Sequence, residues 1–449
     1  MTYKISKIFL IISLIISPIL LGGNRHGFEL INLTLTILAL GFFIHSGNMT
    51  KLFSDLNKNT RNIIIFLFVI IPAWMVLQAT SLTPDFLNHP LWQELGINGA
   101  ISLNPGLTWS ALMGYMSLSI VLIGVYMAMY DVKAAIQLQF ICLTIINAIA
   151  LFGLIVYLFD LQTYGILDSE INLKWINGTF IYKNAMANFI GFGIIICMSY
   201  LVELLLLKRI HSTKLPLFTQ AFLISLNLIF LAISQILTAS RGGIMSTLIA
   251  VIFLVLLVMF VNKSRKKKNA LPNGVKIIVI LLVLFAAFVA LYYLAQFRGD
   301  SAIHSTQARL ALIADSIIAV VDRPLLGHGA GTYIDLEPLY HYANSIDHIF
   351  WNKLHSTPME IMVTLGIPIF LIIYYFVAAI FIRLLKRCLK SNNNWILIIP
   401  AAAIIVEMLV HGVFDFTIQV PAISLYAFFL VSLSFNQKFR RKPPSHPAE

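Results

Sequence analysis

Two arginines in this chain have the surroundings expected of groups that hold an anionic substrate. Arg241 stands in TASRGG, residues 238–243, at the end of a long apolar segment, and the glycines after it allow a ligand to approach the backbone closely. Arg309 lies in QARLALI, where apolar residues recur at helical spacing. A guanidinium group binds two phosphate oxygens at once. Arg241 and Arg309 are therefore candidates for holding a phosphate.

His355 is the candidate for proton transfer. It opens the stretch HSTPME, residues 355–360, in which Thr357 and Glu360 match a capping box with proline at the first helical position. The partial positive charge of a helix N-terminus disfavours imidazolium, so the ring should stay neutral. A neutral imidazole can take a proton from an acceptor hydroxyl. Ser356, beside it, is a candidate for a supporting role.

Three further side chains belong to the candidate site. Lys183 lies in FIYKNAMANF, where a loop re-enters the membrane. His411 and Asp415 are four residues apart, so they could pair and orient each other, although packing or capping is an equal alternative. The basic residues also have structural alternatives, because Arg241 and Lys183 suit the role of interface anchors and Arg309 that of a solvated helix face or ion pair.

The sequence indicates no metal and no cofactor. The histidines of one long loop are spaced 13, 7 and 7 residues apart, which matches no familiar zinc site; they are His328, His341, His348 and His355. Asp168 and Glu170 form a weak candidate for a divalent-cation pair, and two solvated acids are the better interpretation. The three cysteines form neither a CxxC pattern nor a disulfide framework.

The elements that must position these residues are transmembrane helices. The chain is 59% hydrophobic and 11% charged, whereas soluble domains are about 45–50% apolar. We therefore expect an all-α polytopic membrane protein with about 12 transmembrane helices. The predicted spans are residues 5–22, 27–46, 62–81, 108–129, 133–158, 184–207, 215–237, 243–261, 275–296, 359–384, 395–411 and 418–435.

Charge sets the predicted orientation. With both termini in the cytoplasm, most of the 31 Lys and Arg residues fall on the cytoplasmic side, as the positive-inside rule requires. Orientation alone accounts for the net charge of +12, so nucleic acid is not an expected partner. The predicted parts are helices one to nine in residues 1–296, a large, partly helical outer loop in 297–358, helices ten to twelve in 359–435, and a cytoplasmic tail in 436–449.

Taken together, the motifs resemble the O-antigen ligase and polymerase superfamily (Wzy_C-like) of bacterial envelope glycosyltransferases. The resemblance runs from about residue 177 to 421, in the family's order. His355-Ser356, nine residues and Gly366 fit the ligase signature, while Ile369 departs from its last position. The matching stretches are NGTFIYKNAMANF, TASRGG, QARLALI with DRPLLGHGAGTY, LHSTPMEIMVTLGIP and LVHGVFDFTIQVP.

The resemblance implies an enzyme of the bacterial inner membrane whose active site faces the periplasm. Its donor would be a glycan on undecaprenyl diphosphate, moved to an acceptor sugar, the lipid A core oligosaccharide in a ligase, with inversion and without metal. Arg241 and Arg309 would hold the diphosphate, with Lys183 as a third cation. His355 would act as the base or position the acceptor hydroxyl.

Other functions remain open at this stage. A polysaccharide polymerase or a protein O-oligosaccharyltransferase of the same superfamily would differ only in its acceptor. A transporter is an alternative from another class, because twelve helices suit one. Transporters usually show repeated halves and helices interrupted at the midplane, and no internal repeat is evident in this sequence.

Overall fold

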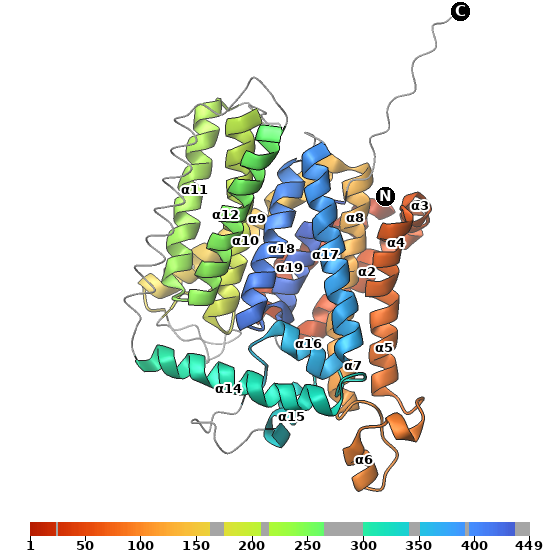
Figure 1. The fold of residues 1–449 in the computed structure, drawn as a ribbon. Helices are drawn as coiled ribbons and strands as arrows, with labels where there is room; N and C mark the ends of the chain where they lie inside the picture. Colours follow the sequence, from red (N-terminus) through yellow and green to blue (C-terminus); the bar gives the residue numbers. More distant parts are fainter. Residues whose placement is uncertain are drawn as a thin grey trace, which may run out of the picture.

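The computed structural model describes residues 1–23, 26–161, 175–207, 215–264, 300–340, 351–390 and 395–435, and within these ranges the secondary structure is entirely helical (Figure 1). The helices are, in chain order, α1 Thr2–Ile19, η1 Leu21–Gly23, α2 His26–His45, α3 Asn48–Asp55, α4 Lys58–Ile65, η2 Phe66–Ile70, α5 Ile71–Ala79, η3 Asp85–Leu87, α6 Pro90–Glu94, α7 Pro105–Met116, η4 Ser117–Ile120, α8 Val121–Tyr130, α9 Val132–Leu158, α10 Lys183–Leu207, α11 Leu217–Leu237, α12 Arg241–Ser264, α14 Asp300–Asp322, α15 Tyr333–Tyr340, α16 Thr357–Leu365, α17 Ile367–Lys390, α18 Trp395–Phe414, η5 Thr417–Gln419 and α19 Pro421–Ser432. The predicted all-α fold is confirmed.

Ten helices of the described ranges are long and apolar enough to cross a membrane, and each corresponds to a predicted span. The predicted span 275–296 and the tail 436–449 lie outside the described residues. The predicted span 418–435 contains a shorter helix than expected. Its helix, α19, has 12 residues and measures about 18 Å at 1.5 Å per residue, short of a hydrocarbon core of about 30 Å.

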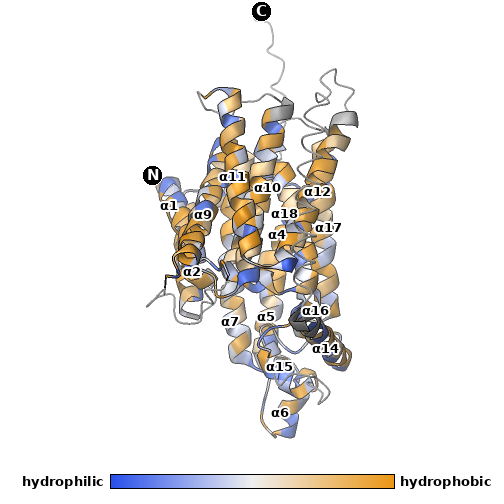
Figure 2. Ribbon diagram, turned by 90° about the vertical axis from the view of Figure 1, so that its left-hand side faces the viewer, coloured by the Kyte–Doolittle hydropathy of each residue, from blue (hydrophilic) through white to orange (hydrophobic). Residues whose placement is uncertain are grey.

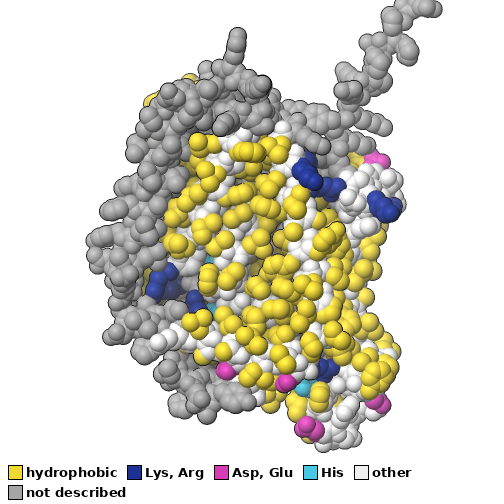
Figure 3. All heavy atoms as spheres, in the orientation of Figure 1, with side chains coloured by type: hydrophobic (Ala, Val, Ile, Leu, Met, Phe, Trp, Pro, Cys, Tyr) yellow, Lys and Arg dark blue, Asp and Glu magenta, His cyan; other side chains and the backbone are white. Residues whose placement is uncertain are grey.

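The surface supports a multi-pass membrane protein. Hydrophobic residues cover most of the bundle helices, and polar residues gather around α6 and α14–α16 at one end (Figure 2). The space-filling view shows a broad hydrophobic face along the bundle, with charged side chains mainly toward its ends (Figure 3). A soluble protein rarely exposes a continuous apolar patch of this extent, whereas in a membrane such a face is covered by lipid.

Two of the basic residues predicted to be cytoplasmic, Arg383 and Arg387, lie at the end of the bundle away from α14. Arg383 of α17 donates hydrogen bonds to Thr60 Oγ1 and Asn57 Oδ1 at the start of α4. Arg387, one turn further, donates to the carbonyl oxygen of Ser434, just beyond α19. The N-terminus also lies at this end (Figure 1). Only the positive-inside rule indicates which side of the membrane this end of the bundle faces.

Helix α10 lies at the centre of the bundle. It is the most buried of the ten spanning helices and packs against α9, α11, α12 and α18. The start of α10, the start of α12 and the end of α18 therefore come together at the end of the bundle that faces α14. This end holds the candidate site.

The predicted span 359–384 corresponds to α17, Ile367–Lys390, which begins later than expected. Gly366, with a φ of +88°, separates the short helix α16 from the spanning helix α17. An added Cβ at Gly366 would lie 2.4 Å from the carbonyl oxygen of Leu325, so only glycine allows this approach. Helix α16 consequently packs beside α14 and α15 at the end of the bundle (Figure 1).

The stretch GHGAG, residues 327–331, attaches these outer helices to the bundle. The backbone N–H groups of His328 and Gly329 donate to the carbonyl oxygens of Val363 and Thr364 in α16. Gln78 at the end of α5 donates from its side-chain amide to the carbonyl oxygens of Leu326 and Thr364. These bonds fix α16, and with it the segment that carries His355, against the membrane helices.

Candidate functional site

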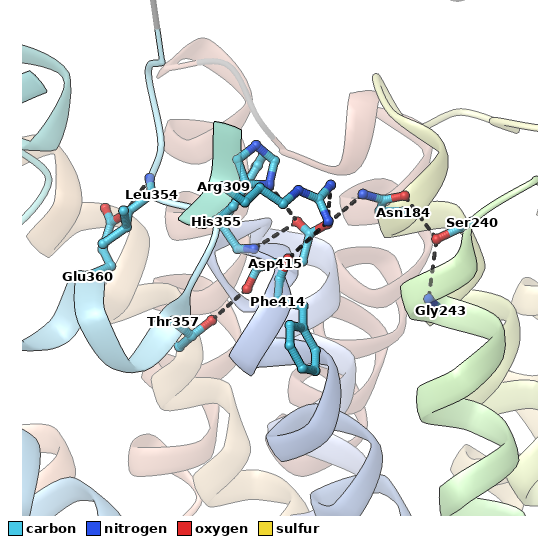
Figure 4. Close-up of polar contacts among 11 residues, drawn as sticks. Asn184, Ser240, Gly243, Arg309, Leu354, His355, Thr357, Glu360, Phe414 and Asp415 are labelled. Atoms are coloured by element: carbon cyan, nitrogen blue, oxygen red, sulfur yellow. Dashed lines mark hydrogen bonds and ion pairs between the residues drawn. The ribbon is translucent and has the colours of Figure 1, made fainter. Parts of the chain in front are cut away.

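Asp415, the first residue after α18, is the centre of the candidate site (Figure 4). Its side chain is 2% exposed. The Oδ2 atom accepts a hydrogen bond from Asn184 Nδ2 and lies 3.9 Å from Arg309. The Oδ1 atom accepts from the backbone N–H of Phe416 and lies 3.8 Å from His355 Nδ1. Burial raises the pKa of Asp415, while Arg309 and the two hydrogen bonds oppose that rise.

A chain of hydrogen bonds links Asp415 to the start of α12. Asn184 Oδ1 accepts from Ser240 Oγ at 2.9 Å, and Ser240 Oγ accepts from the backbone N–H of Gly243 at 3.2 Å. Ser240 therefore caps α12. Ala239 before it has a φ of +53°, a left-handed conformation that is unusual for a residue other than glycine. This turn sets the direction in which Arg241, the first residue of α12, leaves the loop.

Lys183, Arg241 and Arg309 come to the site from three different helices, α10, α12 and α14. Lys183 interacts electrostatically with both arginines, and its ammonium group lies over the ring of Trp175, 4.1 Å from the centroid. Arg309 donates a long hydrogen bond of 3.4 Å to the carbonyl oxygen of Phe414. Arg241 is half-buried and makes no ion pair within the described residues. Among the described residues, the ion pair of these cations with a carboxyl group is that of Arg309 with Asp415, so positive charge is in excess there.

His355 lies between two aromatic rings beside this carboxyl. Trp351 and Phe416 meet its ring edge-to-face, with centroids 5.0 and 4.8 Å away. Burial, and then the charge of Arg309, lowers the pKa of His355 to about 3. The ring is therefore neutral at pH 7. Its Nδ1 has no hydrogen-bond partner in the described part of the chain, because 3.8 Å to Asp415 exceeds hydrogen-bond length.

The capping box predicted for Thr357 and Glu360 is wrong in its pairing. Ser356 holds the N-cap position without a side-chain bond, and Thr357 is already helical. Thr357 Oγ1 donates instead to the carbonyl oxygen of Asp415 at 3.1 Å. Glu360 Oε2 accepts from the N–H of Leu354, two residues before the N-cap. Both bonds hold the loop around His355, so the predicted position of His355 just before a helix start is correct.

His411 and Asp415, predicted as a pair or as packing residues, do not pair. Helix α18 ends at Phe414, so Asp415 leaves the helical path that would place it over His411. Both ring nitrogens of His411 lack a hydrogen-bond partner among the described residues. The Nε2 atom faces Gly242, where an added Cβ would lie 3.3 Å away. Packing is therefore the observed role of His411, and a catalytic one stays a prediction, as it does for Ser356.

Most of the weak metal candidates lie outside the described residues. Asp168, Glu170, His341 and His348 lie outside the described residues. Within those residues no group of three or more His, Cys, Asp and Glu side chains could hold a metal ion. His328 pairs with His89 at 2.9 Å instead of approaching His355.

Sequence reasoning missed Asn184 and Ser240. Both are small, uncharged and common in membrane helices, so their residue types alone gave no signal. Their positions did carry one, because Asn184 follows Lys183 directly and Ser240 precedes Arg241 directly. Short polar residues beside an isolated cation at a helix start are the natural caps and positioning groups for it.

Comparison with known proteins gives a family match for part of the chain. Residues 226–374 match the model of the O-antigen ligase (Wzy_C) family, a stretch that contains Arg241, Arg309 and His355. Lys183, Asn184 and Asp415 lie outside it. No curated protein matches the chain. The match confirms the resemblance drawn from the motifs: residues 226–374 are similar to the O-antigen ligase family.

Proposed function

We propose that this protein is a glycosyltransferase of the O-antigen ligase type. It moves a glycan from undecaprenyl diphosphate to the lipid A core oligosaccharide at the periplasmic face of the bacterial inner membrane. The observation that carries the proposal is the convergence of Lys183, Arg241 and Arg309 beside the neutral ring of His355. The family match over residues 226–374 supports the same reaction class.

The three cations suit the donor. A lipid diphosphate gains negative charge as its bond to the sugar breaks, and fixed cations stabilise that charge most effectively in a site from which water is excluded. Arg241 is half-buried at a helix N-terminus, where the helix dipole also favours an anion. Lys183 and Arg241 lie at the starts of α10 and α12, and Arg309 lies on α14 at the same end of the bundle, where the headgroup of a polyprenyl lipid would sit.

His355 suits the acceptor. Its neutral ring, with the Nδ1 proton directed at Asp415, leaves Nε2 free to accept the proton of an acceptor hydroxyl. The hydroxyl oxygen then attacks the anomeric carbon, and the bond between that carbon and the diphosphate oxygen breaks with its electron pair leaving on the diphosphate. Attack opposite the leaving group inverts the anomeric centre. Asp415, 3.8 Å from Nδ1, stabilises the imidazolium that forms.

The enzyme needs no nucleotide sugar and no metal in this scheme. The lipid diphosphate is already an activated leaving group, and arginine and lysine side chains supply the positive charge that a divalent cation would otherwise provide. The basic residues predicted for the opposite end of the bundle support a periplasmic position for this end, by the positive-inside rule. The bound partners are thus a lipid-linked glycan, a glycan acceptor and membrane lipid.

Deletion of the gene, followed by a gel of the lipopolysaccharide, tests the proposal. A ligase is expected to leave core oligosaccharide without any attached polysaccharide. Core carrying a single repeat unit would identify a polymerase, and an unchanged lipopolysaccharide with an unglycosylated membrane or pilus protein would identify a protein O-oligosaccharyltransferase. A complete ladder with no other glycan lost would exclude the whole class.

A further inference from the structure

A buried polar cluster lies inside the membrane bundle below the candidate site. Its central residue is Glu407 of α18, which is fully buried. Glu407 Oε1 accepts hydrogen bonds from Asn188 Nδ2 at 3.0 Å and from Thr247 Oγ1 at 2.9 Å. Gln235 Nε2 donates to Thr247 Oγ1 at 2.7 Å and completes the cluster. Four helices, α10, α11, α12 and α18, thus meet at one carboxyl group.

The surroundings of Glu407 favour its neutral form. No Lys, Arg or His side chain of the described residues pairs with it, and an unpaired charge inside the bilayer is costly. Two buried oxygens in the cluster also lack a partner, Glu407 Oε2 and Asn188 Oδ1. A proton on Oε2 supplies the donor that Asn188 Oδ1 needs, which makes an acid–amide pair.

Close packing makes the cluster rigid. Gly191, one turn after Asn188 on α10, faces the same carboxyl group. An added Cβ there would lie 1.9 Å from Glu407 Oε1 and 2.4 Å from Thr247 Oγ1. The three helix backbones can therefore approach only because residue 191 has no side chain, and the polar bonds then fix their relative heights.

The cluster lies directly behind the site on each of three helices. Asn188 follows Asn184 by one turn of α10, Thr247 follows Arg241 by six residues of α12, and Glu407 precedes Asp415 by eight residues. At 1.5 Å per residue, these separations are about 6, 9 and 12 Å along the helices. A shift of one helix at the cluster would therefore move a residue of the site by a similar distance.

We propose that Glu407, as a neutral acid, is the positioning residue of the transferase site: it holds α10, α12 and α18 in register, so that Asn184, Arg241 and Asp415 meet. The inference rests on the proposed function for its effect on catalysis. It goes beyond that function because Glu407 touches no part of the site and acts only through Asn188 and Thr247.

Steady-state transfer by the purified full-length protein in lipid tests this role, with a synthetic undecaprenyl-diphosphate glycan as donor. Glu407→Gln keeps an uncharged hydrogen-bonding group and is expected to retain kcat within about threefold. Glu407→Ala is expected to lower kcat at least about tenfold with a smaller change in donor KM, since displacement of about 1 Å can cost up to 100-fold. Equal losses of kcat for both variants would contradict the proposal that Glu407 acts as a neutral acid. Full kcat for Glu407→Ala would contradict its positioning role.

A matched control separates positioning from general stability. Tyr200 donates to Gln139 Oε1 at 3.1 Å, a buried bond between α9 and α10 that lies away from the site. Gln139→Leu removes that bond and is expected to lower the Tm about as much as Glu407→Ala while keeping kcat. A parallel loss of kcat in both variants would assign Glu407 to stability alone.

A geometric measurement keeps the inference testable if the protein transfers no glycan from this donor. Cysteines introduced at Asn184 and Ser240, whose side chains touch in the native protein, report the register of α10 and α12 through disulfide formation under mild oxidation. The yield is expected to be the same with Glu or Gln at 407 and to fall severalfold in Glu407→Ala. An unchanged yield in Glu407→Ala would refute the positioning role, whatever the activity.

Discussion

Asp415 Oδ1 lies 3.8 Å from His355 Nδ1 in the candidate site. The same carboxyl lies 3.9 Å from Arg309 through its second oxygen. One side chain therefore faces both the proposed base, His355, and Arg309, which is proposed to bind the diphosphate. Asp415 therefore links the two halves of the reaction. It lies beside His355, which takes up the proton, and beside Arg309, which is proposed to bind the diphosphate as its negative charge develops.

Asp415→Asn is expected to lower the rate of glycan transfer about 100-fold. The amide keeps the size of the side chain but cannot stabilise imidazolium. A buried Asp that bonds its histidine directly is worth roughly 10⁴-fold, and the longer distance here reduces the effect. Asp335→Asn is the control, because Asp335 accepts from Asn104 at 2.7 Å elsewhere in the outer region. Equal rates for both variants would remove Asp415 from the mechanism.

Arg241→Ala and Arg309→Ala are each expected to lower transfer by about 10²–10³-fold, the usual cost of one charge-stabilising donor. The lysine variants should recover only part of that loss, since lysine keeps the charge but cannot bind two phosphate oxygens with one planar group. Complementation of the deletion strain, read on a lipopolysaccharide gel, measures the effect. Arg383→Ala, at the opposite end of the bundle, is the control, and full ladders from both site variants would contradict the assignment.

The sequence predicted the membrane architecture well because hydropathy reports spanning segments directly. It also drew attention to Arg241 and Arg309, since cations are rare in the predicted outer region, and to His355, which lies just before a predicted helix start. Both departures from the predicted span boundaries have local causes. An apolar run cannot reveal that Gly366 breaks the helix, because the break depends on a close approach by Leu325. Helix α19 looked long enough because apolar residues continue past both of its ends.

The connections within the site could not be predicted from the sequence. Asp415 and Asn184 are 231 residues apart, and only the packing of α10 against α18 brings them together. Glu407 was overlooked because one acid in an apolar segment has no partner that spacing can identify. Its partners, Asn188 and Thr247, come from two other helices.

The protonation state of His355 is expected to leave the rate of transfer unchanged from pH 8 down to about pH 5. Burial lowers the pKa of His355 from 6.5 to about 3, so the base remains neutral throughout that range. Because the unfolded chain binds the proton more readily, the same pKa shift makes the free energy of unfolding depend on pH. The contribution of His355 to that free energy is full above pH 6.5 and is lost as the pH falls toward 3. A pH–rate profile of kcat/KM with an acid limb near 6.5 would contradict the neutral, buried ring.

Transfer is expected to survive EDTA. The proposed charge stabilisation comes from Lys183, Arg241 and Arg309, none of which binds a metal. Purified protein assayed with and without chelator measures this directly. Loss of activity restored by magnesium or manganese would instead point to the acidic pair Asp168 and Glu170, and Asp168→Asn would then abolish the rescue.

Gly243→Ala is expected to reduce both stability and transfer. Gly243 lies in the first turn of α12, where an added Cβ would be 2.4 Å from Ala187 Cβ on α10 and 3.1 Å from Ser240 Oγ. The start of α12 would have to move away from α10, at a cost of about 1–3 kcal/mol for overpacking. Arg241 and the bond from Ser240 to Asn184 would move with it, so transfer should fall at least about tenfold.

Gly41→Ala provides the matched control for this variant. Gly41 also lies inside a spanning helix, α2, but an added Cβ there would meet nothing within 4 Å. The same change of residue should therefore leave both Tm and transfer rate nearly unchanged. Wild-type transfer by Gly243→Ala, with its Tm lowered, would show that the start of α12 can shift without disturbing the reaction, and Arg241 would then lose its place among the groups that hold the donor.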